Sequence, residues 1–333
     1  MKVLVIGLGS MGKRRVRNLA AVGGVSIAGL DVRADRRAEA SAKYGITAYG
    51  RYDEALAHFA PDALVISTGP AHHMDYAHGA ADAGLPCFIE ASVVDADRIA
   101  ALHERTKLAG PVMAPSCTMR HFPGPRIVKR LMTEGVIGRP LSGTYHVGQY
   151  LPDWHPWERI EDFYVSHRAT GGAREIVPFE LTWLNDVFGT PEPLACAKAK
   201  LTDLPADIDD TYMAVLRYDG HFLLNLTIDV VARPHATRIM RLLGSEGELV
   251  FDGDANEVRY ATVRAPEWVR LDLGGGTVEA GYIYPEEPYV AEMRDFIAAV
   301  RQRDARAFPN SLMDDFHVLQ TLYRLEALSE GAR

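Results

Sequence analysis

The sequence predicts a two-domain α/β protein: a doubly wound parallel sheet, followed by an α+β domain built on a largely antiparallel, open sheet. To about residue 119, short apolar runs alternate with helical segments, which is typical of a parallel sheet covered on both faces. After Pro123-Gly124-Pro125, strand-like runs follow one another across turns such as Asp219-Gly220. A chain of 333 residues is also longer than most chains that fold around a single hydrophobic core. We therefore expect one domain at 1–119 and a second at 120–333.

The first domain is expected to begin with a strand at 2–6, a helix, and a second strand that ends near Asp31. The elements expected after these are strands at 63–67, 86–89 and 112–114 and helices at 74–83 and 97–108. Ligands of a doubly wound sheet bind beyond the carboxyl ends of its strands. The segments 68–73 and 90–92, which follow two of these strands, are therefore candidate parts of a binding site.

The second domain is expected to hold helices at 126–134 and 178–188, the latter with Pro178 in its first turn, where a missing N–H is tolerated. Its expected strands lie at 141–150, 194–201, 211–218, 222–231, 238–243 and 248–251. Helices at 289–301 and 314–328 close the chain. Strands joined by short turns pair with their neighbours, so the sheet should be largely antiparallel.

The turn after the first strand has the glycine spacing of a dinucleotide-binding site. It consists of Gly7, Leu8, Gly9, Ser10, Met11 and Gly12, which we expect to contact the cofactor. Gly7 permits a sharp turn, Gly9 lets the backbone approach a pyrophosphate, and Gly12 lets the helix pack closely on the strand. The free N–H groups and dipole at the helix N-terminus favour the phosphates. The sequence therefore predicts a Rossmann-type domain that binds NAD or NADP.

Asp31 favours NAD over NADP. A carboxylate at the end of the second strand accepts hydrogen bonds from a ribose 2′-hydroxyl and repels a 2′-phosphate. Arg33, Arg36 and Arg37 follow closely, and an arginine there could hold a 2′-phosphate instead or simply begin a solvated helix. We expect Asp31 and Arg33 to border the cofactor.

Composition narrows the classes of partner and compartment. A formal charge of −8 argues against a surface for nucleic acid or anionic membrane, and the basic run Lys13, Arg14, Arg15 and Arg17 is expected to be a solvated face or to attract phosphate. Three distant cysteines imply a reduced, cytoplasmic protein, and neither a signal peptide nor a membrane-spanning run is expected. The adjacent histidines His72 and His73 have Asp75 nearby, but no third soft ligand is spaced to join them, so we expect no metal site.

Several further motifs resemble the glucose–fructose oxidoreductase / inositol dehydrogenase (Gfo/Idh/MocA) family along nearly the whole chain. These are Ser67-Thr68-Gly69-Pro70-Ala71-His72-His73, similar to the family's TPxxxH, Met119-Arg120-His121-Phe122-Pro123, Glu134-Gly135-Val136-Ile137-Gly138-Arg139-Pro140, and Gly171-Gly172 before a helix. The segment 147–157 also resembles members associated with bacterial surface-sugar biosynthesis. The resemblance implies an oxidoreductase for a sugar, nucleotide sugar or inositol, with Thr68, Gly69, Pro70, His73, Glu90 and Ala91 at the cofactor. His73 is expected to cap its helix or border the cofactor. A homodimer or homotetramer through the antiparallel sheet is also implied.

Two positions depart from the family pattern. The family has Glu-Lys-Pro, with a proton-relaying lysine, where this chain has Glu90-Ala91-Ser92. An aspartate and a histidine of the family align with Glu175 and Phe179. Alanine and phenylalanine cannot transfer protons, and a carboxylate needs a raised pKa or a partner to act at neutral pH.

The acid/base would then come from another side chain. Glu175, His155 and His167 are the candidates for catalysis, with Tyr150 and Tyr164 nearby, although a structural or substrate-positioning role is the alternative for each. The residues expected to contact substrate are Arg120, Tyr150, Trp154, Trp157, Arg174 and Phe179. Lys198 and Lys200 are the only lysines beyond residue 129 and fall in an expected strand. Two other functions fit the same motifs: an epimerase or lyase that uses NAD transiently, and a dinucleotide-binding protein without dehydrogenase chemistry.

Overall fold

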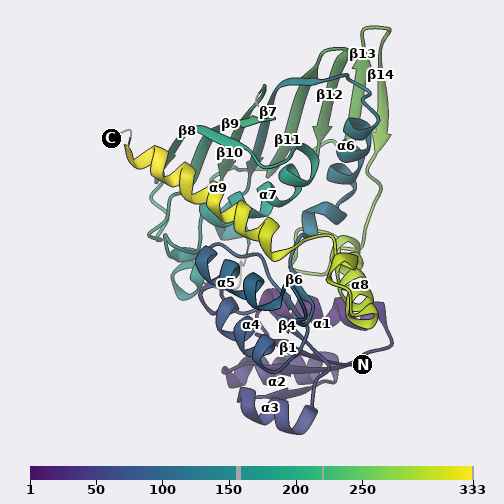
Figure 1. Ribbon diagram of the computed structural model, residues 1–333. Coiled ribbons are helices and arrows are strands. Elements are labelled where there is room, and N and C mark those ends of the chain that lie inside the picture. The colour runs from purple at the N-terminus through teal and green to yellow at the C-terminus, as the bar shows by residue number, and fades with distance from the viewer. Residues whose placement is uncertain (155–158, 220, 332–333) are drawn as a thin grey trace. The chain divides into compact units, whose positions relative to one another are not determined.

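The computed structural model describes residues 1–154, 159–219 and 221–331, and the chain forms two compact units (Figure 1). The first unit comprises Met1–Thr118 and Pro285–Phe316, and the second comprises Met119–Tyr284 and His317–Arg333.

A six-stranded parallel sheet forms the centre of the first unit, with strand order β3-β2-β1-β4-β5-β6. Its strands are β1 (Lys2–Ile6), β2 (Ser26–Leu30), β3 (Thr47–Tyr49), β4 (Ala63–Ile66), β5 (Cys87–Ile89) and β6 (Met113–Pro115). The helices are α1 (Ser10–Val22), α2 (Ala34–Tyr44), α3 (Tyr52–Phe59), α4 (His73–Asp82), α5 (Ala96–Thr106) and α8 (Glu287–Gln302), with the 3₁₀ turns η1 (Pro70–His72) and η6 (Ala305–Ala307). The strand order reverses between β1 and β4, which is where a ligand binds in such sheets.

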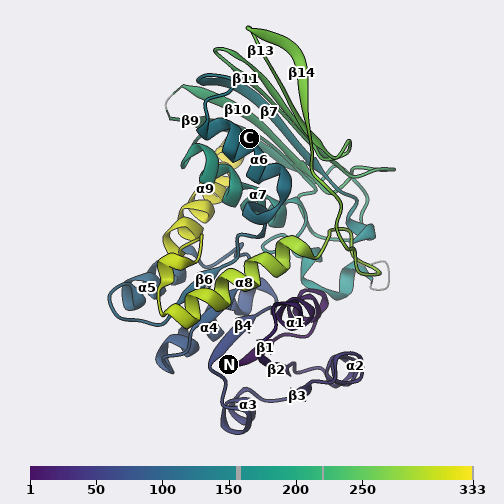
Figure 2. The same cartoon turned by 90° about the vertical axis from the view of Figure 1, so that its right-hand side faces the viewer.

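The core of this unit explains why a late segment belongs to it. Four residues of β1 and all of β4 are almost completely buried. Met293, Phe296 and Ile297 of α8 pack in the same cluster as Val16 and Leu19 of α1, and Figure 2 shows the two helices side by side. The second unit therefore differs from the domain expected at 120–333. Residues 285–316 belong to the first unit, because the apolar face of α8 is buried against α1.

The second unit holds an eight-stranded sheet with the order β14-β13-β12-β11-β7-β10-β9-β8. Its strands are β7 (Pro140–Gly148), β8 (Glu192–Ala199), β9 (Thr211–Tyr218), β10 (Phe222–Asp229), β11 (Thr237–Gly244), β12 (Gly247–Asp252), β13 (Glu257–Thr262) and β14 (Ala265–Asp272). The β7–β10 pair is parallel and the other pairs are antiparallel, so the predicted sheet class is confirmed. The strands β13 and β14 are absent from the elements expected from sequence, because charged residues interrupt both strands and β14 is mostly exposed.

The helices of the second unit are α6 (Pro123–Thr133), α7 (Ala173–Phe188) and α9 (Leu312–Gly331), the last of which begins in the first unit. Short 3₁₀ turns lie at η2 (Thr118–His121), η3 (Leu151–Asp153), η4 (Ile160–Asp162) and η5 (Tyr164–Ser166). The prediction that Pro178 lies in the first turn of its helix is wrong, since α7 begins at Ala173 and contains Pro178 in its interior. This earlier start places Glu175 in the first turn of α7.

The two faces of the eight-stranded sheet differ in burial. One face carries fully buried side chains such as Tyr145, Leu224 and Met240. Figure 2 shows α6 and α7 on this side of the sheet, and the opposite face carries no helix of the described part of the second unit. The large apolar side chains exposed on that opposite face are Met213, Leu223, Ile239, Leu243 and Trp268.

Candidate active site

The glycine turn of the first unit has the geometry of an anion-binding helix N-terminus. Gly7 has a φ of +89°, and a Cβ on Gly12 would lie 1.7 Å from the carbonyl oxygen of Gly7, so both positions require glycine. The N-cap residue of α1 is Gly9, which has no side chain to cap the first turn. The described atoms within 4 Å of a Cβ placed on Gly9 belong to the flexible side chain of Arg36. The backbone at Gly9 is therefore accessible to a ligand, with the N–H groups of Ser10 and Met11 beside it.

Asp31 lies directly against this turn. Its buried carboxylate accepts hydrogen bonds from the main-chain N–H of Leu8 at 2.8 Å and from that of Arg33 at 2.9 Å. Each carboxylate oxygen can accept a second hydrogen bond, so the position expected for an adenine ribose is chemically suitable. The glycine turn, the helix terminus and Asp31 together fit a dinucleotide.

The structure distinguishes among the three arginines after Asp31. The guanidinium of Arg33 is paired with Asp35 at 2.5 and 3.1 Å, and Arg37 donates to the carbonyl oxygens of Asp31 and Val32. Arg36 extends toward the turn, with Nη1 3.9 Å from the Asp31 carboxylate. Arg36 rather than Arg33 is thus the arginine placed beside the expected cofactor site.

The segment after β4 is fixed by His73. Its Nε2 lies 2.9 Å from the carbonyl oxygen of Thr68, so that nitrogen carries the hydrogen. His73 is buried, and burial lowers its pKa, which favours the neutral imidazole. His73 does not cap α4 among the described residues, because its Nε2 bonds the carbonyl oxygen of Thr68 and its Nδ1 has no hydrogen-bond partner there; its expected place beside the cofactor stays a prediction. The hydrogen bond instead sets the loop that contains Thr68, Gly69 and Pro70.

The segment after β5 is fixed by a buried arginine from the basic run on α1. Arg15 is completely buried and donates to both oxygens of Glu90 at 2.6 and 2.9 Å, while its Nη1 lies 2.9 Å from Glu292. Ser67 adds a hydrogen bond to Glu90 at 3.2 Å. Arg14 is also buried, paired with Glu286. The expectation of a solvated basic face is therefore wrong for both arginines, whose acidic partners are distant in sequence.

Glu175 is the candidate acid/base of the second unit. The hydroxyl of Tyr164 donates a hydrogen bond to its Oε1 at 2.6 Å. Oε2 is shielded from solvent and has no hydrogen-bond partner among the described residues, although the side chain as a whole is partly exposed. Burial raises the pKa of Glu175 from 4.5 to about 7, against the lowering effect of the Tyr164 hydrogen bond. This carboxyl group therefore titrates near neutral pH.

The other expected site residues of this unit have varied environments. Phe179 lies one turn after Glu175 on α7 and is half-buried, whereas His167 is exposed just after η5. Tyr150 accepts a hydrogen bond from Arg233 at 3.1 Å. Trp154 is half-buried, and its shielded indole N–H has no partner in the described part of the chain. His155 and Trp157 lie outside the described residues.

Both expected substrate arginines have protein partners. Arg120 donates to the carbonyl oxygen of Thr182 at 3.0 Å and lies 3.7 Å from Asp186. Arg174 is paired with Glu326 at 2.7 and 3.3 Å and donates to the carbonyl oxygen of Ala169. These contacts favour structural roles for both guanidinium groups.

The two late lysines are also engaged. Lys198 contacts Asp209 at 3.1 Å, and Lys200 donates to the carbonyl oxygen of Ala206 at 2.6 Å. Neither is an evident substitute for a catalytic lysine.

Comparison with protein families places both units in one group. Residues 1–110 match the model of an oxidoreductase family with an NAD-binding Rossmann fold, and residues 126–250 match the GFO/IDH/MocA C-terminal domain. The chain belongs to the GFO/IDH/MocA family. It is accordingly an oxidoreductase whose cofactor is NAD, and the residues at the glycine turn suit that cofactor. A comparison with curated proteins finds no match.

Solved structures share the fold of this GFO/IDH/MocA protein. An oxidoreductase from Agrobacterium radiobacter in complex with NAD+, L-tartaric acid and magnesium is 14% identical with a TM-score of 0.85, covering 100% of this chain and 97% of its own. Levoglucosan dehydrogenase in complex with NADH is 18% identical with a TM-score of 0.84, covering 99% and 97%. GenD2 from gentamicin A biosynthesis in complex with NAD is 17% identical with a TM-score of 0.82, covering 100% and 95%. At these identities the likeness shows the fold alone.

None of the described helices combines the length and apolar character needed to cross a membrane. No group of three His, Cys, Asp or Glu side chains is arranged to hold a metal ion in the part of the chain that the structure describes.

Proposed function

We propose that the protein is an NAD-dependent dehydrogenase or reductase for a hydroxyl or keto group of a sugar-like substrate, with Glu175 as the proton acceptor and donor. The observation that carries this proposal is the Glu175 carboxyl group, which has a pKa of about 7 and a hydrogen bond from Tyr164. A general base is most effective when its pKa is near the working pH. Glu175 satisfies this condition, whereas Ala91 and Phe179 have no proton to exchange.

Oxidation of a secondary alcohol requires removal of a hydride and a proton. NAD, when bound, supplies the hydride acceptor. The carboxylate of Glu175 takes the hydroxyl proton, and the protonated carboxyl returns it in the reverse direction. The Tyr164 hydroxyl stabilises the charged form and orients the carboxylate through Oε1. Near pH 7 both protonation states are well populated, which suits either direction.

The substrate class is proposed from two sources. Two structural neighbours are levoglucosan dehydrogenase, whose name indicates a sugar-like substrate, and GenD2 from gentamicin A biosynthesis. The resemblance of residues 147–157 to proteins of surface-sugar biosynthesis favours a sugar, nucleotide sugar or inositol. Tyr150 and Trp154 from this segment would contact the substrate ring, since aromatic faces pack well on sugars.

A second function is favoured by Ala91 and Phe179. A protein that binds NAD without turnover would need neither a lysine nor a histidine at these positions. The experiment that separates the two functions is a screen of sugars, nucleotide sugars and inositols for a change in nicotinamide absorbance. Turnover that falls roughly 10²- to 10⁴-fold in Glu175→Gln, with NADH affinity retained, supports the dehydrogenase.

The same screen tests the two histidines and the epimerase or lyase function. His155→Asn and His167→Asn serve as parallel variants for the histidine candidates. Loss of turnover in one of these variants, with Glu175→Gln fully active, would assign proton transfer to that histidine instead. Product formation without net accumulation of NADH would indicate an epimerase or lyase. NAD binding with no turnover on any substrate would favour the binding protein.

The assembly and compartment are also proposals. The apolar side chains on the exposed sheet face suit a second copy of this chain, giving a homodimer or homotetramer, because a row that includes Met213 and Ile239 would otherwise face water. Met213→Glu should reduce the mass measured by light scattering to that of the monomer, whereas Glu267→Gln on the exposed strand β14 should not. Three buried free cysteines are consistent with a reducing, cytoplasmic location.

A further inference from the structure

Tyr164 is held inside a tightly packed segment that precedes α7. The hydroxyl of Thr170 donates to the carbonyl oxygen of Tyr164 at 2.9 Å. A Cβ on Gly171 would lie 2.1 Å from the carbonyl oxygen of Val165, so the backbone at Gly171 is in direct contact with the backbone at Val165. The position of the Tyr164 hydroxyl therefore depends on what holds the segment 163–172 as a whole.

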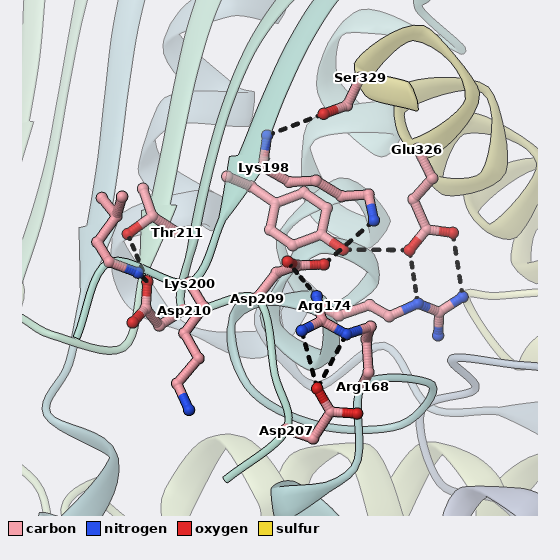
Figure 3. Close-up of polar contacts among 12 residues, drawn as sticks. Arg168, Arg174, Lys198, Lys200, Asp207, Asp209, Asp210, Thr211, Glu326 and Ser329 are labelled. Atoms are coloured by element: carbon pink, nitrogen blue, oxygen red, sulfur yellow. Dashed lines mark hydrogen bonds and ion pairs between the residues drawn. The ribbon is translucent and has the colours of Figure 1, made fainter. Parts of the chain in front are cut away.

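Arg168 attaches this segment to the loop before β9 (Figure 3). Its Nε and Nη2 donate to the carboxylate of Asp207 at 3.2 and 2.8 Å, and its Nη1 donates to Asp209. The main chain reinforces the attachment, since Asp207 N–H donates to the carbonyl of Ser166 at 3.0 Å and Ala173 N–H donates to the carbonyl of Asp209 at 3.1 Å. The same loop thus contacts the segment at Ser166 and Arg168, and contacts α7 at Ala173, directly after the segment.

Asp209 is the fixed end of this attachment. Its carboxylate is buried and also contacts Lys198 of β8 at 3.1 Å, as Figure 3 shows. Asp207 is exposed, so its pair with Arg168 alone would contribute little. The forked guanidinium joins the exposed carboxylate to the buried one, a geometry that a lysine ammonium cannot reproduce.

We infer that Arg168 is a positioning residue that holds the Tyr164 hydroxyl on Glu175 through the carboxylates of Asp207 and Asp209. This inference rests on the proposed role of Glu175. The other charged groups around this region also have partners: Arg174 contacts Glu326 and donates to the carbonyl oxygen of Ala169, while Lys198 shares Asp209 with Arg168 and also contacts Glu330. Tyr164 is the titratable side chain whose hydrogen bond reaches Glu175, so displacement of the segment acts on Glu175 through that bond.

The test measures the titration of Glu175 without any substrate. For each protein, the difference in Tm from its Glu175→Gln counterpart is recorded from pH 5 to pH 9. The slope of this difference against pH falls to zero as Glu175 loses its proton in the folded protein, and the midpoint of that fall reports the Glu175 pKa. Tyr164→Phe should raise the midpoint by about one pH unit, because a hydrogen bond to the charged form is lost. Arg168→Lys keeps the charge and loses the fork, and should raise the midpoint in the same direction by a smaller amount.

The double variant Arg168→Lys/Tyr164→Phe distinguishes positioning from a direct charge effect. It should have the midpoint of Tyr164→Phe alone, since the hydrogen bond through which Arg168 acts is already absent. Arg217→Lys is the matched control, because Arg217 makes a two-pronged contact with Glu192 on strands β9 and β8 and should leave the midpoint unchanged. Asp207→Asn removes the exposed half of the attachment and replaces Arg168→Lys if that variant does not fold.

The possible results separate the inference from the proposed function. A shift in Tyr164→Phe without a shift in Arg168→Lys or Asp207→Asn would overturn the positioning role and leave the role of Glu175 intact. An additive shift in the double variant would also overturn it, in favour of a direct charge effect. An unchanged midpoint in Tyr164→Phe would overturn the inference, whereas a wild-type midpoint far below pH 7 would remove the basis of the proposed acid/base.

Discussion

Replacement of Glu175 by glutamine should lower activity and raise stability in the same protein. The substitution keeps the shape of the side chain and removes its titration. The pKa of about 7 in the folded protein lies above the ordinary value of 4.5, so between these pH values the folded protein holds a proton that the unfolded chain has released. The cost of the buried charge is therefore absent below about pH 4.5, grows as the pH rises, and is complete above about pH 7.

The size of this cost follows from the same two values. At about 1.4 kcal/mol per pH unit, a pKa raised from 4.5 to about 7 corresponds to a cost of about 3 kcal/mol. Partial exposure of the side chain makes this an upper value. Glu175→Gln should thus melt several degrees above the wild-type protein at pH 8.5 and at the same temperature at pH 4.5 to 5.

The assay is differential scanning fluorimetry across this pH range, with Glu267→Gln as the matched control. Glu267 lies exposed on β14, so the same substitution there should give a small difference in Tm that does not depend on pH. A Glu175→Gln difference that is constant with pH, or that grows toward acid, would refute the raised pKa. The proposed role of Glu175 as a base at neutral pH would then lose its physical reason.

Three further predictions concern the first unit. Gly9→Val should abolish NAD binding in calorimetry while leaving Tm near the wild-type value, since a Cβ there meets only Arg36 among the described side chains; unchanged affinity would contradict the pyrophosphate site. Asp31→Ala should weaken NAD binding and reduce the disadvantage of NADP, and Arg36→Gln should weaken any residual NADP binding; a wild-type protein that strongly prefers NADP would reverse this assignment. Arg15→Met should cost about 3–5 kcal/mol in stability, because it leaves Glu90 and the fully buried Glu292 without their cation, and a Tm within the range of surface variants would show the pair to be dispensable.

Local motifs explain why much of the first unit could be predicted. The strand, the glycine turn, the helix and Asp31 are specified by contiguous residues, and each glycine has a steric requirement that is visible in the sequence pattern. The placement of α8 depends instead on apolar residues that pack against α1 from the far end of the chain. The pattern 289–301 indicates an amphipathic helix but not which core covers its apolar face.

Long-range charge pairing is the main feature that the sequence pattern does not reveal. Arg15 lies in a run of basic residues that suggests a solvated helix face, yet it is enclosed because Glu90 and Glu292 come from distant segments. Periodicity can indicate which helix positions are polar. To predict that a charged side chain is buried, the residue that pairs with it must also be known. Arg120 and Arg174 illustrate the same limit, since contacts within the fold already occupy guanidinium groups expected to bind substrate.

The pKa of Glu175 shows why a candidate acid/base can be proposed from the sequence although its protonation state cannot. Arg168 and Arg174 lie within seven residues of Glu175, and two nearby cations would by themselves lower its pKa. In the folded unit, Arg168 is paired with Asp207 and Asp209, and Arg174 is paired with Glu326, so the positive charges are balanced locally. Burial then dominates at Glu175 and raises its pKa instead. The charges near Glu175 in the sequence therefore predict a lowered pKa, whereas the pKa in the folded unit is raised. The carboxylates that neutralise the two arginines come from distant segments, the loop before β9 and the helix α9.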